Sequence, residues 1–191
     1  LRLDCSPSQV DAVIFITKNP TPILDKMDVF REYAVGFQVT VTPYGPEIEP
    51  GLPDKRIVLD SFRKLADRLG SSHMILRYDP IFFSPRYDEA FHLRAFERCC
   101  KQLSGACTQV ILSHLDFYKN TRRHQRELNW LPDSLDRFRQ LAPQLAQIGK
   151  QYGMQLQLCA EDLDLQRAGI VNRSCMDAAW LEVLTGRKLD Y

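Results

Sequence analysis

Met154-Gln155-Leu156-Gln157-Leu158-Cys159-Ala160-Glu161 alternates apolar and polar side chains with the period of two that is typical of a β-strand. Leucine and alanine fall on one side of this predicted strand, and glutamine, cysteine and glutamate fall on the other. A half-exposed strand at the edge of a sheet would explain the polar row. A strand that lines a ligand cavity would also explain it, because the far end of the row carries Cys159 and Glu161.

Four further segments have strand-like patterns, and helical patterns alternate with them. The predicted strands cover residues 11–17, 36–42, 73–79, 108–113 and 154–161. The predicted helices cover residues 22–33, 54–69, 87–103 and 133–152. This alternation predicts an α/β fold with a parallel sheet and helices packed outside it. About five strands are too few to close an eight-stranded barrel, so we expect a partial, TIM-barrel-like (β/α) barrel of about five units.

Two details of this prediction concern burial. Residues 11–17 form a nearly continuous apolar run, which predicts a strand buried on both faces. In the strand of residues 73–79, Tyr78 should point into the helix layer, because Arg77 and Asp79 share the other face.

The composition is that of an ordinary folded domain. Of the 191 residues, 45% are hydrophobic and 26% are charged, and the formal net charge is +1. This balance gives no global reason to expect a nucleic acid or an anionic membrane as a partner. Apolar runs fall short of the roughly 20 residues of a membrane span, so we expect a cytoplasmic protein. We expect one domain over residues 1–191, excerpted from a longer chain, and the oligomeric state stays open.

The six cysteines are too sparse for a disulfide scaffold. The adjacent Cys99 and Cys100 fit reduced thiols on a helix, and we assign both, with Cys107, to packing. Cys159 and Cys175 each stand two residues before an acid, but two thiols alone do not make a metal site. They are either buried and inert or part of a site with further ligands.

Polar or ionisable side chains stand at or just beyond the carboxyl end of every predicted strand. These residues are Lys18 and Asn19, Tyr44, Arg77 and Asp79, His114 and Asp116, and Cys159 and Glu161. In parallel α/β folds the ligand lies at these ends. Polar rows on single strand faces, such as Gln38, Thr40 and Thr42, further indicate a polar lumen.

Each of these side chains also has a structural interpretation. Arg77 and Asp79 could form an ion pair with each other instead of binding a substrate or cofactor. Lys18 and Asn19 precede a proline and fit ordinary turn chemistry. His114 could be an acid–base group, a metal ligand or a structural histidine.

Two loops carry charged residues. The proline-rich residues 43–53 contain Glu47 and Glu49, which we interpret as part of a solvated loop. A basic segment after the fourth strand contains Lys119, Arg122, Arg123, His124 and Arg126, followed by Trp130. This segment could hold phosphates or a nucleic-acid backbone, or it could be a solvated loop.

Taken together, the strand ends resemble a known family. The segments that carry the resemblance are Val10-Asp11-Ala12-Val13-Ile14-Phe15 with Thr17-Lys18-Asn19-Pro20, Tyr44-Gly45 with Glu49-Pro50, Leu76-Arg77-Tyr78-Asp79-Pro80, Ser113 with Asp116, Tyr118 and Lys119, and Cys159-Ala160-Glu161 with Cys175-Met176-Asp177. They resemble an uncharacterised bacterial family of radical S-adenosylmethionine (SAM)-like proteins. That family is a domain of unknown function grouped with DNA repair proteins of the spore photoproduct lyase type.

The resemblance implies a partial βα barrel whose strand ends hold SAM and an iron–sulfur cluster. In such a family three cysteines spaced C-x3-C-x2-C hold the cluster, and we expect that motif beyond Tyr191, since this sequence does not contain it. The resemblance also implies a Cys-x-Cys pair there, which could complete a second metal site with Cys159 and Cys175.

The resemblance assigns roles to the polar strand ends as well. Arg77, Asp79 and Glu161 would line the lumen and orient cofactor or substrate. The rim would be formed by Lys18, Asn19, Tyr44, His114 and Asp116.

Two other functions stay open. A divalent-metal hydrolase or sugar isomerase would use Asp79, His114, Asp116 and Glu161 as ligands and acid–base groups. A non-catalytic barrel would bind a ligand, or a nucleic acid through residues 119–126. Whether the substrate is a small molecule or a nucleic acid is not fixed by the sequence.

Overall fold

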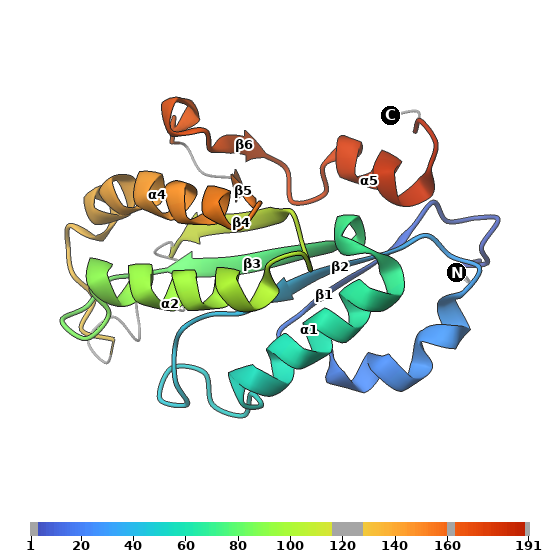
Figure 1. The fold of residues 1–191 in the computed structure, drawn as a ribbon, viewed down its shortest axis with the longest axis horizontal. Helices are drawn as coiled ribbons and strands as arrows, with labels where there is room; N and C mark the ends of the chain where they lie inside the picture. Colours follow the sequence, from blue (N-terminus) through green and yellow to red (C-terminus); the bar gives the residue numbers. More distant parts are fainter. Residues whose placement is uncertain (1–3, 116–127, 160–162, 190–191) are drawn as a thin grey trace.

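Six parallel strands form one sheet in the computed structural model, which describes residues 4–115, 128–159 and 163–189. The strands are β1 (Val13–Thr17), β2 (Val35–Thr40), β3 (Met74–Ile81), β4 (Gln109–His114), β5 (Gln155–Cys159) and β6 (Val171–Arg173). They lie side by side in chain order, each parallel to the next (Figure 1). The predicted α/β fold with a parallel sheet is therefore confirmed. Strands in chain order are also the arrangement from which a (β/α) barrel is built.

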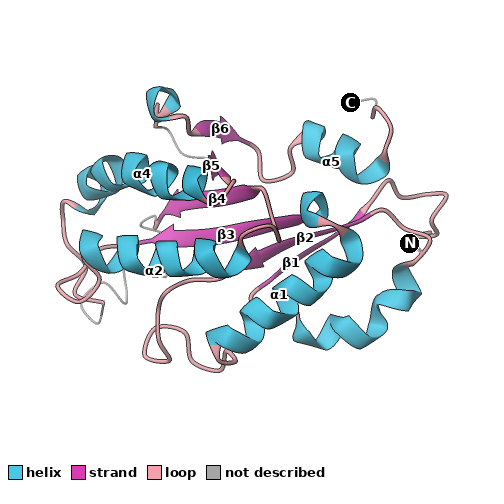
Figure 2. Ribbon diagram, viewed as in Figure 1, coloured by secondary structure: helices cyan, strands magenta, loops and turns pink. Residues whose placement is uncertain are grey.

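Helices α1 (Lys55–Leu69), α2 (Glu89–Leu103) and α4 (Ser134–Gln151) cover one face of the sheet, which we call the outer face (Figure 2). The last helix, α5 (Ala178–Thr185), packs on the opposite face, the inner face. The short 3-10 segments are η1 (Thr21–Phe30), η2 (Ser71–His73) and η3 (Gln166–Ala168). Helix α1 begins where the sequence predicts, because the Asp54 side chain accepts a hydrogen bond from the backbone N–H of Arg56.

The outer face carries apolar side chains, and the helices bury them. Phe37 of β2 and Tyr78 of β3 are 0% and 1% exposed and belong to the main core together with Phe62 of α1 and Phe96 of α2. The ring centroids of Tyr78 and Phe96 lie 5.0 Å apart. The predicted outward direction of Tyr78 is therefore confirmed.

Three of the cysteines belong to this core. Cys99, Cys100 and Cys107 are free thiols and are buried, which confirms their packing role. Burial raises the pKa of both Cys100 and Cys107 to about 12, so their thiols stay protonated near neutral pH.

The two ends of the sheet differ from the prediction. β1 is not buried on both faces, because α5 covers Ile14 but not Ile16, which lies on the same face of the strand. The Ile16 side chain is 58% exposed. β6 has no counterpart in the predicted strands, since the three residues Val171–Arg173 are too short to show a pattern.

Helix α5 closes the inner face at the amino ends of the strands. Trp180 and Leu184 pack there against Ile75 of β3 and Ile111 of β4. Trp180 also donates a hydrogen bond from Nε1 to the carbonyl oxygen of Ser72 at 2.9 Å. Gly36 of β2 allows α5 to pack this closely on the sheet, because a Cβ atom at position 36 would lie 2.6 Å from Cδ1 of Leu184. The carboxyl ends of the strands carry the polar side chains of the inner face.

Candidate functional site

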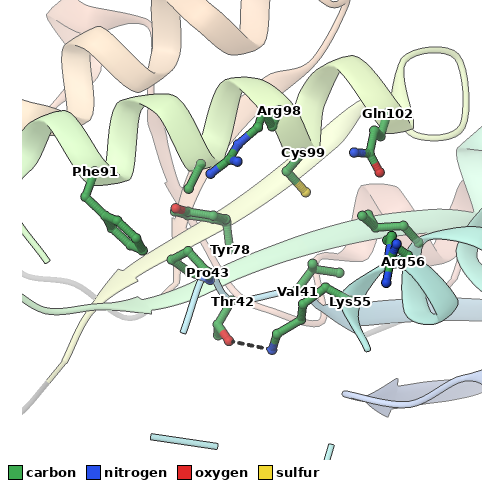
Figure 3. A pocket seen from close by; sticks show the side chains of 12 residues that line it. Val41, Thr42, Pro43, Lys55, Arg56, Tyr78, Phe91, Arg98, Cys99 and Gln102 are labelled. Atoms are coloured by element: carbon green, nitrogen blue, oxygen red, sulfur yellow. Dashed lines mark hydrogen bonds between the residues drawn. The ribbon is translucent and has the colours of Figure 1, made fainter. Parts of the chain in front are cut away.

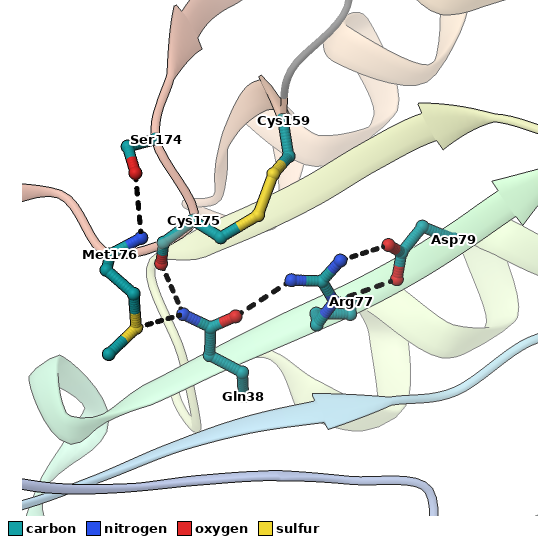
Figure 4. The surroundings of a disulfide bond; sticks show 7 residues. All are labelled: Gln38, Arg77, Asp79, Cys159, Ser174, Cys175 and Met176. Carbon is teal, nitrogen blue, oxygen red and sulfur yellow. Dashed lines mark hydrogen bonds and ion pairs between the residues drawn. A yellow bond between two sulfur atoms is a disulfide. The ribbon is translucent and has the colours of Figure 1, made fainter.

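A continuous series of polar contacts crosses the inner face toward the carboxyl ends of the strands (Figure 4). Arg77 donates from Nη2 and Nε to the two carboxylate oxygens of Asp79, at 2.5 and 3.2 Å. From Nη1 it donates to Oε1 of Gln38 at 2.9 Å. Gln38 in turn donates from Nε2 to the backbone carbonyl of Cys175 at 2.5 Å. The ion pair that the sequence left as one alternative is therefore present, and it is part of a larger network.

Strand alternation explains why these groups meet. On β3, Leu76 and Tyr78 turn outward into the core, so Arg77 and Asp79 turn inward. Gln38 of β2 is 0% exposed although it stands between the core residues Phe37 and Val39. Its burial is possible because both ends of its amide have partners.

The Asp79 carboxyl group lies in a low-dielectric environment. Burial raises its pKa above the ordinary value of 3.8, while hydrogen bonds from Arg77 and Ser113 and the charge of Lys18 act in the opposite direction. Arg77 is less deeply buried than Asp79, with side-chain exposures of 16% and 7%. One N–H on each terminal nitrogen of Arg77 takes no part in the network, so the guanidinium can still bind another acceptor.

A disulfide bond borders this network. Cys159 at the end of β5 is bonded to Cys175, and their Cα atoms are 5.6 Å apart. From the sequence, both residues were either inert cysteines or ligands of a metal site completed by further residues, but sulfurs that are bonded to each other offer no thiolate to a metal. In the structure the disulfide instead anchors the Cys175 carbonyl that holds Gln38. An open pocket of about 590 Å³ lies beside it, lined in part by Arg173 and Met176.

Lys18 is paired with Glu49. The Glu49 carboxylate accepts hydrogen bonds from Lys18, from Thr42 and from Lys55, the last at 2.7 Å. Burial raises the pKa of Glu49, but these three hydrogen bonds outweigh burial and hold the pKa below 4.5. With a side-chain exposure of 9%, Glu49 joins the loop to β1 and α1, so its interpretation as a solvated residue is wrong.

Tyr44 and His114 do not lie with the network, although the sequence placed both at the rim. The Tyr44 hydroxyl donates to the carbonyl of Pro80 at 2.9 Å and accepts from the N–H of Phe82 at 3.1 Å, inside an aromatic cluster. His114 is 7% exposed on the outer face, where its Nε2 lies 2.9 Å from Oγ of Ser134 in α4. Alternation along β4 explains this direction, because His114 shares the parity of the buried Val110 and Leu112 rather than that of Ser113.

The remaining predicted residues divide into two groups. Asn19 makes a turn contact, in which its Oδ1 accepts from the N–H of Thr21 at 3.2 Å. Asp116, Glu161 and the basic residues 119–126 lie outside the described residues. In the part of the chain that the structure describes, no group of three or more His, Cys, Asp or Glu side chains could hold a metal ion.

Gln38 and Ser113 belong to the network but were not predicted as site residues. The signal for Gln38 was present, since a glutamine within Val35-Gly36-Phe37-Gln38-Val39 interrupts an apolar strand. Ser113 stands at a strand end and among the segments that carry the resemblance, but its contact with Asp79 depends on the pairing of β3 with β4, which the sequence does not show.

A model of a known protein family matches nearly the whole chain. Residues 1–190 match the family described as Domain of unknown function (DUF1848). The chain belongs to this family. A search of curated proteins found none that matches it. The description of this family names no function. Among the helices of the described residues, none has the length and apolar character needed to cross a bilayer.

Proposed function

We propose that this protein is the barrel core of a radical SAM-like enzyme that binds cofactor or substrate on the inner face, at the carboxyl ends of the strands. The observation that carries the proposal is the Gln38–Arg77–Asp79 network, an inward-facing ion pair whose guanidinium has N–H groups that no other described residue engages. Parallel α/β proteins bind their ligands at this end of the sheet. The resemblance of the strand ends favours the radical SAM-like class over other reactions of barrel enzymes.

The described residues fit the organic part of such a cofactor. SAM carries a carboxylate together with ammonium and sulfonium groups. The free N–H groups of Arg77 suit the carboxylate, and the Asp79 carboxylate suits a cation. These two residues would therefore bind and orient the methionine part of SAM or a similarly charged substrate.

The described residues do not fit an iron–sulfur cluster, which needs several cysteine thiolates in one place. Cys159 and Cys175 are bonded to each other. Cys99, Cys100 and Cys107 lie in the core under the helices, away from the inner face. The cluster that the proposed class requires would need ligands from outside the described residues, so binding and orientation are the roles assigned to the inner face.

Gln38 has a positioning role in this proposal. Its amide oxygen accepts from Arg77 and its amide nitrogen donates to the Cys175 carbonyl. The reversed amide would place its NH₂ group against the guanidinium and its oxygen against a carbonyl oxygen, so only one orientation is favourable. Arg77 is therefore held from two sides, by Gln38 and by Asp79, before any ligand binds.

The geometry does not favour the divalent-metal hydrolase. Asp79 faces the inner side of the sheet and His114 faces α4 on the outer side, so these two side chains do not share a metal site. A nucleic-acid-binding barrel would depend on residues 119–126, which lie outside the described residues.

Binding of SAM to the anaerobically purified protein, measured by isothermal titration calorimetry, tests the proposal. We expect the wild type to bind SAM and Arg77→Gln to bind it at least about tenfold more weakly, because a charge-assisted hydrogen bond to the ligand is lost. Arg139→Gln is the matched control, since Arg139 pairs with Asp136 on the surface of α4.

Two results would contradict the proposal, namely no SAM binding by the wild type and equal affinities of the wild type and Arg77→Gln. Because Arg77→Gln leaves the Asp79 carboxylate buried without its partner, Arg77→Gln/Asp79→Asn serves as a second variant with both charges removed. Circular dichroism establishes that each variant is folded before its affinity is compared.

A further inference from the structure

A second hollow lies on the outer face, between α1 and α2 (Figure 3). Its volume is about 220 Å³, and its walls include Leu59 of α1, Phe91 and Ala95 of α2, and Tyr78 of β3. The ionisable side chains that line it are the cations Lys55, Arg56 and Arg98 together with Tyr78 and Cys99, and no carboxylate of the described residues lines it. The hollow thus combines an apolar aromatic wall with three cationic side chains, two of which are ion-paired.

The three cations at the rim differ in their availability. Lys55 is bound to the Glu49 carboxylate at 2.7 Å. Arg56 is engaged by Asp54 through two hydrogen bonds, at 2.9 and 3.1 Å. Arg98 has no carboxylate partner within residues 4–115, 128–159 and 163–189, and its Nε donates to a backbone carbonyl at 3.3 Å. Arg98 is therefore the cation that a ligand could engage without breaking an ion pair.

The Tyr78 hydroxyl at the floor of the hollow is a second polar group that a ligand could contact. Tyr78 is 1% exposed, and its hydroxyl reaches only Nδ1 and the carbonyl oxygen of His92, each at 3.5 Å. Such long contacts are weak hydrogen bonds. Figure 3 shows Tyr78 directed toward the side of α2 that carries Phe91 and Arg98. Burial raises the pKa of Tyr78, so its hydroxyl stays protonated and remains a donor.

We propose that this hollow binds a small monocarboxylate with a compact apolar body, its ring or chain packed on Phe91 and its carboxylate held by Arg98. The volume of about 220 Å³ is below the roughly 300–1,000 Å³ of pockets for drug-sized ligands, so a ligand of about ten non-hydrogen atoms fits best. A single available guanidinium matches one planar carboxylate. This site is separate from the inner-face network and does not depend on the function proposed for that network.

Benzoate is the probe for this site, and its binding is measured from amide chemical shifts of the ¹⁵N-labelled protein. We expect saturable shifts at Phe91, Ala95 and Cys99 of α2. Arg98→Gln should weaken binding roughly three- to tenfold, a range that allows for the exposure of Arg98. Benzamide, which has nearly the same shape but no charge, should bind the wild type more weakly than benzoate by a similar factor.

Two variants separate this site from general attraction of an anion. Arg94→Gln removes the same charge from the same helix outside the hollow, so it should leave the benzoate affinity within about twofold of the wild type. Ala95→Phe fills the hollow without changing the charge, so it should abolish the saturable shifts. The spectra themselves establish that these variants are folded.

Three results would overturn the proposal. The first is the absence of saturable shifts in the wild type at 10 mM benzoate, a concentration about tenfold above the Kd of a millimolar binder. The second is equal affinity for benzoate and benzamide. The third is an Arg94→Gln variant that loses as much affinity as Arg98→Gln.

Discussion

The inner face of the sheet has an apolar half under α5 and a polar half beside it. In the apolar half, Trp180 and Leu184 of α5 are buried against strand side chains. In the polar half, Gln38, Arg77 and Asp79 form a buried network bordered by a disulfide. The apolar half gains stability from burial, whereas the polar half pays a desolvation cost to keep charged groups in place. The two halves of one surface are thus held by different physics, the apolar half by burial of apolar area and the polar half by the pairing of its buried polar groups.

The largest expected effect tests the apolar half. Trp180→Ala should lower the free energy of unfolding by about 3–5 kcal/mol, because it removes a side chain that is 2% exposed and its hydrogen bond to Ser72. Urea denaturation followed by circular dichroism measures the change. Trp180→Phe, which keeps an aromatic ring, should lose clearly less. A loss below about 1 kcal/mol for Trp180→Ala would show that α5 does not act as part of the core.

A smaller effect is expected for the disulfide that borders the polar half. Cys159 and Cys175 are 16 positions apart, and closing a loop of about that length stabilises a protein by about 3 kcal/mol. Reduction should therefore shift the urea midpoint of the wild type downward. The Cys159→Ser/Cys175→Ser variant is the control, because its midpoint should not respond to the reductant.

Thiol counting tests the same disulfide independently. Alkylation of the unfolded, unreduced protein should label the four free cysteines Cys5, Cys99, Cys100 and Cys107, and mass spectrometry gives the number. Labelling of all six cysteines of the chain would show that the Cys159–Cys175 disulfide does not form.

The smallest expected effect is a pH dependence that distinguishes Asp79 from Glu49. The pKa of Asp79 is raised above 3.8 by burial, so as the pH rises from 3.8 through that raised value, the unfolded chain loses its proton first. The wild type should therefore lose stability relative to Asp79→Asn in this window. Urea midpoints measured between about pH 3 and pH 7 give the trend, and parallel curves for the two proteins would contradict it.

Glu49 should show the opposite trend. Its pKa is held below 4.5, so as the pH rises from that lowered value to 4.5, the folded protein loses its proton before the unfolded chain does. The wild type should gain stability relative to Glu49→Gln in this window. The same urea series measures this difference, and the two variants serve as controls for each other.

Much of the fold could be predicted because its signals are local. The predicted helix of residues 54–69 corresponds to α1 (Lys55–Leu69), since Asp54 caps it and Gly70 follows it directly. The outward direction of Tyr78 followed from alternation along β3. The same alternation places His114 on the outer face beside Leu112. The prediction of His114 at the rim was wrong because it considered only the position of His114 at the end of the strand and not the face to which its side chain points.

The sequence by itself determined five of the six described strands, the alternation of strands and helices that predicts a parallel sheet, and the shared strand face of Arg77 and Asp79, because each is recorded in local patterns along the chain. Only the tertiary structure decided that Cys159 meets Cys175, that Glu49 joins two lysines, and that α5 closes half of the inner face. Apart from the Glu49–Lys55 pair, these contacts join residues that are 16 or more positions apart in the chain. They form only when strand pairing brings separate segments together, and no local pattern records that pairing.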